Sequence, residues 1–169
     1  MIRTGIGYDV HRFVPGRPCI IGGVAIPSDR GLEGHSDADV LLHAISDALL
    51  GAAGLGDLGR YFPSNDPKIA GISSLKILEQ IVEIVEKKGY KIENIDSVVI
   101  AETPQISTHA DEMRRKIARV AGVSAEAVNV KATTNEQIGF IGRGEGIAAQ
   151  AICTLSSGPS QGRPRGKTP

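Results

Sequence analysis

Three segments with helical periodicity separate runs of aliphatic and β-branched residues, and this order limits the folds that the chain can adopt. Strands are predicted at residues 2–11, 19–21, 24–26, 95–102, 127–133 and 147–155. Helices are predicted at residues 36–54, 74–88 and 108–121. Right-handed crossovers would lay these helices on one face of a single sheet. The sequence therefore predicts an α+β two-layer sandwich, a mixed β-sheet with helices packed on one face.

The first predicted helix begins with a capping pattern. Ser36 is the predicted N-cap, and Asp39, three residues later, takes the place of the Glu of a capping box. Residues 27–34, 56–71 and 134–146 are predicted as loops, and the last has room for one helical turn.

The length of 169 residues fits a single domain, which we place at residues 1–155. Aromatic residues make up only 4% of the chain and Trp is absent, so the core must be aliphatic. Residues 156–169 read SSGPSQGRPRGKTP and cannot bury a core. They are predicted to form a flexible C-terminal tail.

The charge balance indicates which partners are unsupported, and the cysteine content indicates the cellular compartment. The chain has 19 basic and 19 acidic residues, which gives no support for a nucleic-acid or membrane partner. Its two cysteines, Cys19 and Cys153, form no CxxC motif and indicate a reducing compartment. With no signal peptide or membrane span evident, a cytoplasmic location is expected, or a plastid if a transit peptide was removed.

A metal site is the first candidate for chemistry. Asp9 and His11 lie two apart on a predicted strand and therefore point to the same face. Asp39, His43 and Asp47 lie on one face of the first predicted helix, where a carboxylate could orient the His43 ring. Asp9, His11 and His43 would give the three ligands typical of catalytic zinc. The strand pair alone fits an ordinary surface Asp and His better than a metal site.

Two further segments are candidates for ligand binding. The loop at residues 56–66 carries glycine, aspartate and serine that could contact a polyol, although the pattern alone favours an ordinary connecting loop. Residues 132–136 read ATTNE, and hydroxyl and backbone N–H groups at a strand end are common phosphate ligands. Glu136 could hold a harder cation such as Mg²⁺. A simple capping segment would explain the second pattern equally well.

The motifs taken together resemble a known enzyme family. They are GYDVH at 7–11, HSDADVLLH at 35–43, DALLGAA at 47–53, GDLG at 56–59, KATTNE at 131–136 and FIGRGEG at 140–146. The chain resembles the 2-C-methyl-D-erythritol 2,4-cyclodiphosphate synthases of the non-mevalonate isoprenoid pathway, over about residues 2–155.

The resemblance implies a reaction and its cofactors. In the family, the 2-phosphate of 4-diphosphocytidyl-2-C-methyl-D-erythritol 2-phosphate attacks the β-phosphorus of the diphosphate, so that a cyclic diphosphate forms and CMP leaves. The enzyme is a phosphorus–oxygen lyase, and residues 1–155 would be its catalytic domain. The family forms homotrimers with active sites between subunits. Zn²⁺ is expected on Asp9, His11 and His43, and Mg²⁺ or Mn²⁺ near Glu136.

The resemblance also implies roles for individual residues. His35 and Thr134 are expected to stabilise the transition state. The methylerythritol part is expected to contact His35, Ser36, Asp57, Leu58 and Gly59, with Phe62, Pro63, Ser64, Asn65 and Asp66 beside it. Asp9 and His11 are also expected to contact the substrate. The cytidine and its phosphates are expected to contact Ala101, Glu102, Thr103, Pro104, Gln105, Ile106, Ser107, Ala132, Thr133, Thr134, Asn135 and Glu136, with Phe140 and Arg143 near.

One position departs from the family pattern. The loop after Pro104 often carries a Lys that meets the CDP phosphates, and this chain has Gln105 there. A neutral amide can donate hydrogen bonds but adds no charge, so nucleotide affinity is expected to differ while the chemistry is retained. Two other functions stay open from the residues alone: a zinc hydrolase of phosphate esters, and a non-catalytic, metal-stabilised trimeric binding protein.

Overall fold

A five-stranded mixed sheet in the order β4-β1-β7-β5-β6 forms one layer of the molecule. Its strands are β1 (Ile2–Pro15), β4 (Arg30–Leu32), β5 (Tyr90–Ile100), β6 (Val128–Thr133) and β7 (Gly146–Ser157). All neighbours are antiparallel except β5 and β6, which are parallel. A separate hairpin consists of β2 (Cys19–Ile21) and β3 (Val24–Ile26). This computed structural model describes residues 1–63 and 66–157.

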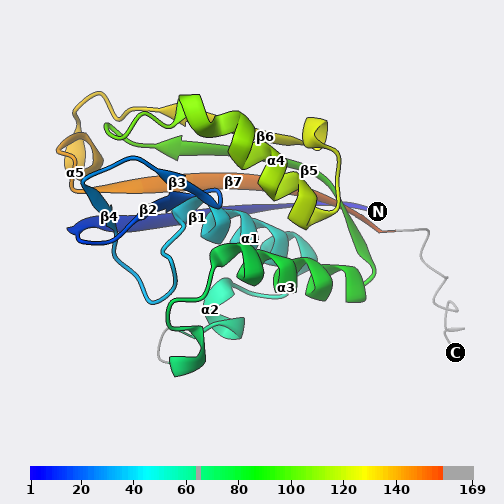
Figure 1. The fold of residues 1–169 in the computed structure, drawn as a ribbon. Coiled ribbons are helices and arrows are strands. Elements are labelled where there is room, and N and C mark those ends of the chain that lie inside the picture. The colour runs from blue at the N-terminus through cyan, green and yellow to red at the C-terminus, as the bar shows by residue number, and fades with distance from the viewer. Residues whose placement is uncertain (64–65, 158–169) are drawn as a thin grey trace, which may run out of the picture.

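Helices form the second layer (Figure 1). The three long ones are α1 (Val40–Ala53), α3 (Ser74–Lys87) and α4 (Ala110–Ala121). Single turns form α2 (Leu58–Tyr61) and α5 (Gly139–Gly142), and short 3₁₀ segments lie at Pro67–Ile69, Ser107–His109 and Ala125–Ala127. The predicted α+β fold, a mixed sheet with helices, is confirmed. Within the described residues, no helix is long and apolar enough to cross a membrane.

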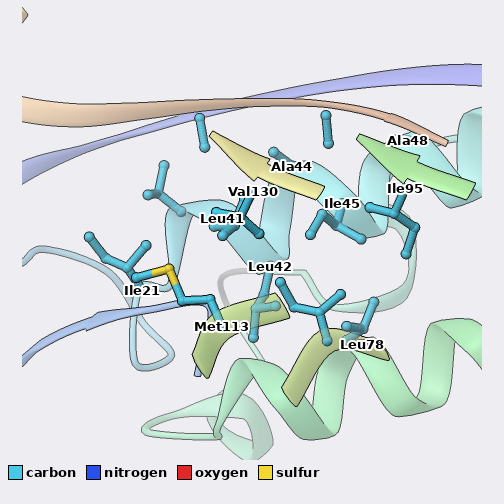
Figure 2. Close-up of a cluster of buried hydrophobic side chains, with 14 of the residues drawn as sticks. Ile21, Leu41, Leu42, Ala44, Ile45, Ala48, Leu78, Ile95, Met113 and Val130 are labelled. Atoms are coloured by element: carbon cyan, nitrogen blue, oxygen red, sulfur yellow. The ribbon is translucent and has the colours of Figure 1, made fainter. Parts of the chain in front are cut away.

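The core lies between the two layers and is aliphatic, as the low aromatic content predicts. Figure 2 shows Leu42 of α1 beside Leu78 of α3 and Met113 of α4, while Ile45 lies by Ile95 of β5 and Leu41 by Val130 of β6. Helix α1 is buried between the sheet and α3, so its position depends on packing on both sides.

Glycines of β1 allow α1 to lie unusually close to the sheet. A Cβ atom at Gly7 would lie 1.9 Å from the Ala44 carbonyl oxygen, and one at Gly5 would lie 2.1 Å from that of Ala48. Real Cβ atoms do not approach backbone atoms so closely, so only glycine is compatible with this packing. The helix contributes small residues at the same contact, with Ala44, Ala48 and Ala52 one turn apart.

Several element bounds differ from the prediction. Helix α1 begins at Val40 with Asp39 as its N-cap, not at Ser36. The Ser36 hydroxyl instead accepts from the Ala38 N–H, and Ala38 has a φ of 58°, which interrupts the helix. The predicted loop at 27–34 contains β4, which pairs with the end of β1, and the loop at 56–71 contains α2.

The end of the last strand also differs. Strand β7 continues to Ser157, because Ser156 pairs with Ile2 and the Ser157 N–H donates to the Met1 carbonyl. The predicted flexible tail otherwise falls on residues 158–169, which lie outside the described residues.

Replacing Gly7 by alanine should push α1 away from β1. Overpacking of this kind typically destabilises a protein by about 1–3 kcal/mol, and here the clash is with rigid backbone. Urea unfolding of Gly7→Ala would measure this loss.

Gly51→Ala is the matched control, because a Cβ there would lie 3.8 Å from its nearest neighbour, the Ile6 carbonyl oxygen. This exposed helical glycine should be neutral or stabilising by about 0.5–1 kcal/mol. Equal stability of the two variants would contradict the close-packing account.

Candidate active site

Strand β1 and helix α1 bring the three predicted metal ligands together. Asp9 Oδ2 lies 2.8 Å from His11 Nε2 and 2.9 Å from His43 Nδ1. The two ring nitrogens are 3.1 Å apart. These three potential ligand atoms all lie within 4.8 Å of one another, so the cluster could hold a metal ion. The juxtaposition of strand and helix, which the spacing alone could not reveal, is therefore present.

Burial and mutual hydrogen bonding set the charge state of this cluster. The side chains of Asp9, His11 and His43 are 25%, 18% and 13% exposed. Burial by itself would raise the pKa of Asp9, but hydrogen bonds and charge attraction from His11 and His43 outweigh it and hold that pKa well below its usual range. Burial opposes the charged form of His11, yet the Asp9 carboxylate raises the His11 pKa. An ionised Asp9 beside two imidazoles is a donor set that suits a divalent cation.

Each histidine makes a second contact through its other ring nitrogen. His11 Nδ1 lies 2.6 Å from the Glu33 carbonyl oxygen, which can only accept, so this nitrogen carries the proton. When the ring is neutral, as a metal ligand must be, Nε2 of His11 keeps its lone pair and faces Asp9 and His43. His43 Nε2 lies 3.1 Å from Ser74 Oγ and 3.3 Å from Ser36 Oγ, on the side away from Asp9. Ligand histidines are commonly oriented by such contacts.

An open cavity of about 610 Å³ adjoins the cluster. It is lined by Asp9, His11, His43, Asp47, Leu58, Gly59, Phe62 and Pro63. Four of these residues come from the loop predicted to contact a polyol, so that loop lies beside the metal ligands. Asp57 caps α2 by accepting from the Arg60 N–H, and the Asp66 N–H donates to the Pro63 carbonyl. The predicted residues Ser64 and Asn65 lie outside the described residues.

His35 lies in a smaller adjoining cavity of about 160 Å³, which also contacts Ser36, His11 and His43. Its side chain is exposed while its backbone is held on both sides. The Arg17 guanidinium donates to the Gly34 carbonyl at 2.5 Å and to the Ser36 carbonyl at 2.6 Å. The His35 carbonyl accepts from the Gly71 N–H at 2.8 Å. Nothing in the sequence pattern identified Arg17 as the residue that fixes this loop.

The second group of predicted residues lies where the parallel strands β5 and β6 end. Because parallel strands end at the same edge, the segments that follow them meet there. They enclose a cavity of about 370 Å³ lined by Ala101, Glu102, Pro104, Gln105, Ile106, Ser107, Ala132, Thr133 and Thr134. A cis peptide bond joins Thr103 to Pro104 in this segment. This cavity shares no lining residue with the cavity at the metal cluster.

Glu102 holds the loop that follows β6. Its Oε1 accepts from the N–H groups of Asn135 at 2.9 Å and Gln137 at 3.1 Å. The Thr134 hydroxyl donates to the Glu136 carboxylate at 2.8 Å. Glu136 and Gln137 both have positive φ, of 51° and 62°. The loop is thus tightly turned and presents the Thr134 and Glu136 side chains at the surface.

Phe140 and Arg143 lie apart from this cavity within the single chain. Phe140 lines a separate pocket of about 380 Å³ that also contacts Val10 and His11. Arg143 makes an exposed ion pair with Glu145 at 2.7 Å. Their predicted proximity to the nucleotide stays a prediction.

The predicted orienting carboxylates of α1 have other partners. Asp39 is fully buried and accepts from the N–H groups of Gly22, Gly23 and Leu42, so it joins the β2–β3 turn to the start of α1. Asp47 accepts from the Leu58 N–H at 2.6 Å and so anchors α2. The group beside His43 Nε2 is instead Ser74 of α3, which the sequence pattern did not single out.

The comparison with known proteins identifies the family. The model of the YgbB family matches residues 2–156, and the chain belongs to that family. Similar curated proteins are named 2-C-methyl-D-erythritol 2,4-cyclodiphosphate synthase. One from Desulforamulus reducens is 55% identical over 93% of this chain and all of its own length. One from Salinibacter ruber is 58% identical over 92% of this chain and 99% of its own.

Solved structures agree with this assignment. A structure described as an IspF–CDP complex from Plasmodium falciparum has a TM-score of 0.82 at 33% identity, covering 94% of this chain and 97% of its own. The bifunctional IspDF from Campylobacter jejuni has a TM-score of 0.90 at 42% identity over 94% of this chain. This chain spans only 43% of that longer protein. The resemblance inferred from the motifs is confirmed.

The buried Asp39 should make stability depend on pH. Burial, together with the nearby Asp37 charge, raises the pKa of Asp39 to about 6 despite three N–H donors. A proton bound more tightly in the folded state stabilises the fold at low pH. This contribution is complete below the ordinary pKa of 3.8 and is lost as pH rises through about 6.

The Asp39→Asn variant isolates this effect, because its residue 39 does not titrate. The free energy of unfolding of the wild type, minus that of the variant, should fall as pH rises from about 4 to 7. Denaturant titrations at intervals across that range would measure it. A difference that is constant with pH, or that grows, would contradict the assignment.

Proposed function

We propose that this chain converts 4-diphosphocytidyl-2-C-methyl-D-erythritol 2-phosphate into 2-C-methyl-D-erythritol 2,4-cyclodiphosphate and CMP, in the non-mevalonate pathway of isoprenoid biosynthesis. It is an enzyme of the cyclodiphosphate synthase type, a phosphorus–oxygen lyase. The observation that carries the proposal is the meeting of Asp9, His11 and His43 at an open cavity in a chain of this family. The cytoplasmic location stays a prediction.

The donor set fits zinc as the first metal. Asp9, His11 and His43 would supply one carboxylate oxygen and two imidazole nitrogens, the donor types and number typical of catalytic zinc sites. When bound, Zn²⁺ and a second cation, Mg²⁺ or Mn²⁺, would neutralise charge on the phosphates. The Glu136 carboxylate is the side chain that we assign to the second cation.

The protein need not supply a nucleophile, because the attacking phosphate belongs to the substrate. The 2-phosphate oxygen forms a bond to the β-phosphorus, the bond from that phosphorus to the bridging oxygen breaks, and CMP carries away the electron pair. The residues must bring two anionic groups together and stabilise charge on the transferring phosphorus. We assign stabilisation to His35, whose backbone Arg17 holds, and to the Thr134 hydroxyl.

The two cavities divide the substrate between them. The cavity at the metal cluster would take the methylerythritol part, with Asp57, Leu58, Gly59 and Phe62 beside it. The cavity at the ends of β5 and β6 would take the cytidine part. Gln105 lines this second cavity and supplies an amide in place of a Lys charge, so nucleotide affinity should depend less on salt.

A homotrimer would join the two halves of the site. The outer face of the sheet exposes Ile2, Ile6, Tyr8 and Val10 of β1 together with Ile152 of β7. Ile6 pairs directly with Ile152, so these side chains form one apolar patch. An exposed patch of this kind typically marks a protein–protein interface. Residues 131–140 are also exposed throughout, although they carry the proposed Thr134 and Glu136 contacts.

A charge on this patch should break the assembly. In Ile6→Glu, association would bury an unpaired carboxylate, which is strongly unfavourable. Light scattering after size exclusion should give three times the chain mass of 17.8 kDa for the wild type and a smaller particle for the variant. Gln80→Glu, on the exposed face of α3, is the control and should remain trimeric. A trimeric Ile6→Glu protein would place the interface elsewhere.

A ³¹P NMR time course tests the proposed reaction directly. Purified protein with the methylerythritol substrate, Zn²⁺ and Mg²⁺ should give a cyclic diphosphate with equimolar CMP. His35→Ala and Thr134→Ala should each lower kcat about 10²–10³-fold, the typical effect of removing one transition-state donor. A linear product with CMP would favour the phosphate-ester hydrolase, and no turnover by folded, zinc-loaded protein would favour the binding protein.

A further inference from the structure

We propose that Ser74 and Asp37 form a relay that positions the metal ligand His43 and fixes its protonation pattern. The inference rests on the metal site proposed above and concerns two residues without an assigned role there. Both lie outside the metal cluster, and they reach His43 from the side opposite Asp9. Ser74 is fully buried at the start of α3, whereas Asp37 lies in the segment before α1.

Asp37 receives two hydrogen bonds from the same serine. Its Oδ2 accepts from the Ser74 N–H at 2.9 Å, and its Oδ1 accepts from the Ser74 hydroxyl at 2.5 Å. The Asp37 carboxylate therefore caps the N-terminus of α3, because it accepts from a free N–H group of the first turn as an N-cap side chain usually does. The residue at the N-cap position itself, Ser73, makes no side-chain capping bond. The start of α3 is thus held by the segment that precedes α1.

The direction of these bonds determines the tautomer of His43. A serine hydroxyl has one proton, and the Ser74 proton goes to the Asp37 carboxylate, which can only accept. Toward His43 Nε2, at 3.1 Å, the Ser74 oxygen can then only accept. Nε2 must carry the ring proton. When the ring is neutral, as a metal ligand must be, Nδ1 keeps its lone pair, and it is this atom that faces Asp9 and His11.

The two histidine ligands are therefore oriented in the same way by different groups. For His11, a main-chain carbonyl, that of Glu33, accepts from the nitrogen opposite the cluster. For His43, the acceptor is a hydroxyl polarised by a carboxylate. The Ser36 hydroxyl, at 3.3 Å from Nε2, is a weaker second acceptor that also accepts from the Ala38 N–H. Carboxylates behind a histidine ligand raise its basicity as well as fixing its ring.

Zinc affinity of the full-length protein tests the relay without reference to turnover. Ser74→Ala should weaken zinc binding about tenfold, the low end of the usual 10–100-fold range, because Ser36 remains. Asp37→Asn should weaken it too, since an amide that donates to Ser74 would turn the hydroxyl proton toward Nε2. Competition with a chromophoric chelator measures the affinities, and circular dichroism and metal-free melting check the fold.

The controls separate the relay from helix capping and from general damage. Ser73→Ala removes the neighbouring hydroxyl at the same helix start and should leave zinc affinity unchanged. The double variant Ser74→Ala/Asp37→Asn should bind zinc no more weakly than the worse single variant, because the two residues act through one contact. A zinc affinity within twofold of wild type in folded Ser74→Ala protein would overturn the proposal. So would a double variant in which the losses of zinc-binding free energy of the two single variants add up.

A measurement on the wild type keeps the test decisive if a variant fails to fold. Long-range ¹H–¹⁵N correlation of the histidine rings in zinc-loaded protein should show His43 protonated at Nε2 and metal-bound at Nδ1. The opposite tautomer of His43 would contradict the proposed relay without contradicting the zinc site. Absence of zinc binding by the wild type would instead remove the proposed metal site, and the relay with it.

Discussion

The close contact between α1 and β1 is the constraint on which the site depends. Gly5 and Gly7 leave room for the helix backbone on the face of β1 that also carries Asp9 and His11, because alternate residues of a strand share a face. The strand therefore has no side chains at Gly5 and Gly7, where the helix contacts it, and the proposed ligands Asp9 and His11 follow on the same face. His43 lies next to Ala44 in the helix and so meets Asp9 within hydrogen-bonding distance. A side chain at either glycine would push α1 outward and move His43 away from Asp9 and His11.

Acidic residues secure this arrangement from several directions, and each acts mainly on backbone N–H groups. Asp39 ties the β2–β3 turn to the start of α1, and Asp47 ties α2 to its middle. Glu102 holds the loop after β6 in the same manner. Rigid support of this kind is what a site that works by positioning requires, since misplacement of a ligand by 1 Å can cost much of the rate.

The elements of the fold could largely be predicted because their periodicities are strong and their ends carry clear signals. Gly54 and Gly122 end α1 and α4 in the left-handed conformation that glycine favours. The start of α1 was predicted wrongly because Ser36 and Asp39 are both good caps, and the choice depends on Gly22 and Gly23, which are distant in sequence. The same limit applies to the site. The motifs identified His43, whereas Ser74 meets it only through the packing of α3 against α1.

The separation of the two cavities within one chain supports the proposed trimer. The metal ligands lie between β1 and α1, while the loop with Thr134 and Glu136 follows β6, at the far edge of the sheet from β4. A phosphorus under attack must contact groups from both regions at once. Within one chain, β7 and β5 stand between β1 and β6, and in the proposed trimer a neighbouring copy would supply the second group of residues. The apolar outer face of β1 and β7 provides a surface on which copies could pack. Assembly and catalysis would then depend on the same strand, β1, whose two faces carry the ligands and the interface.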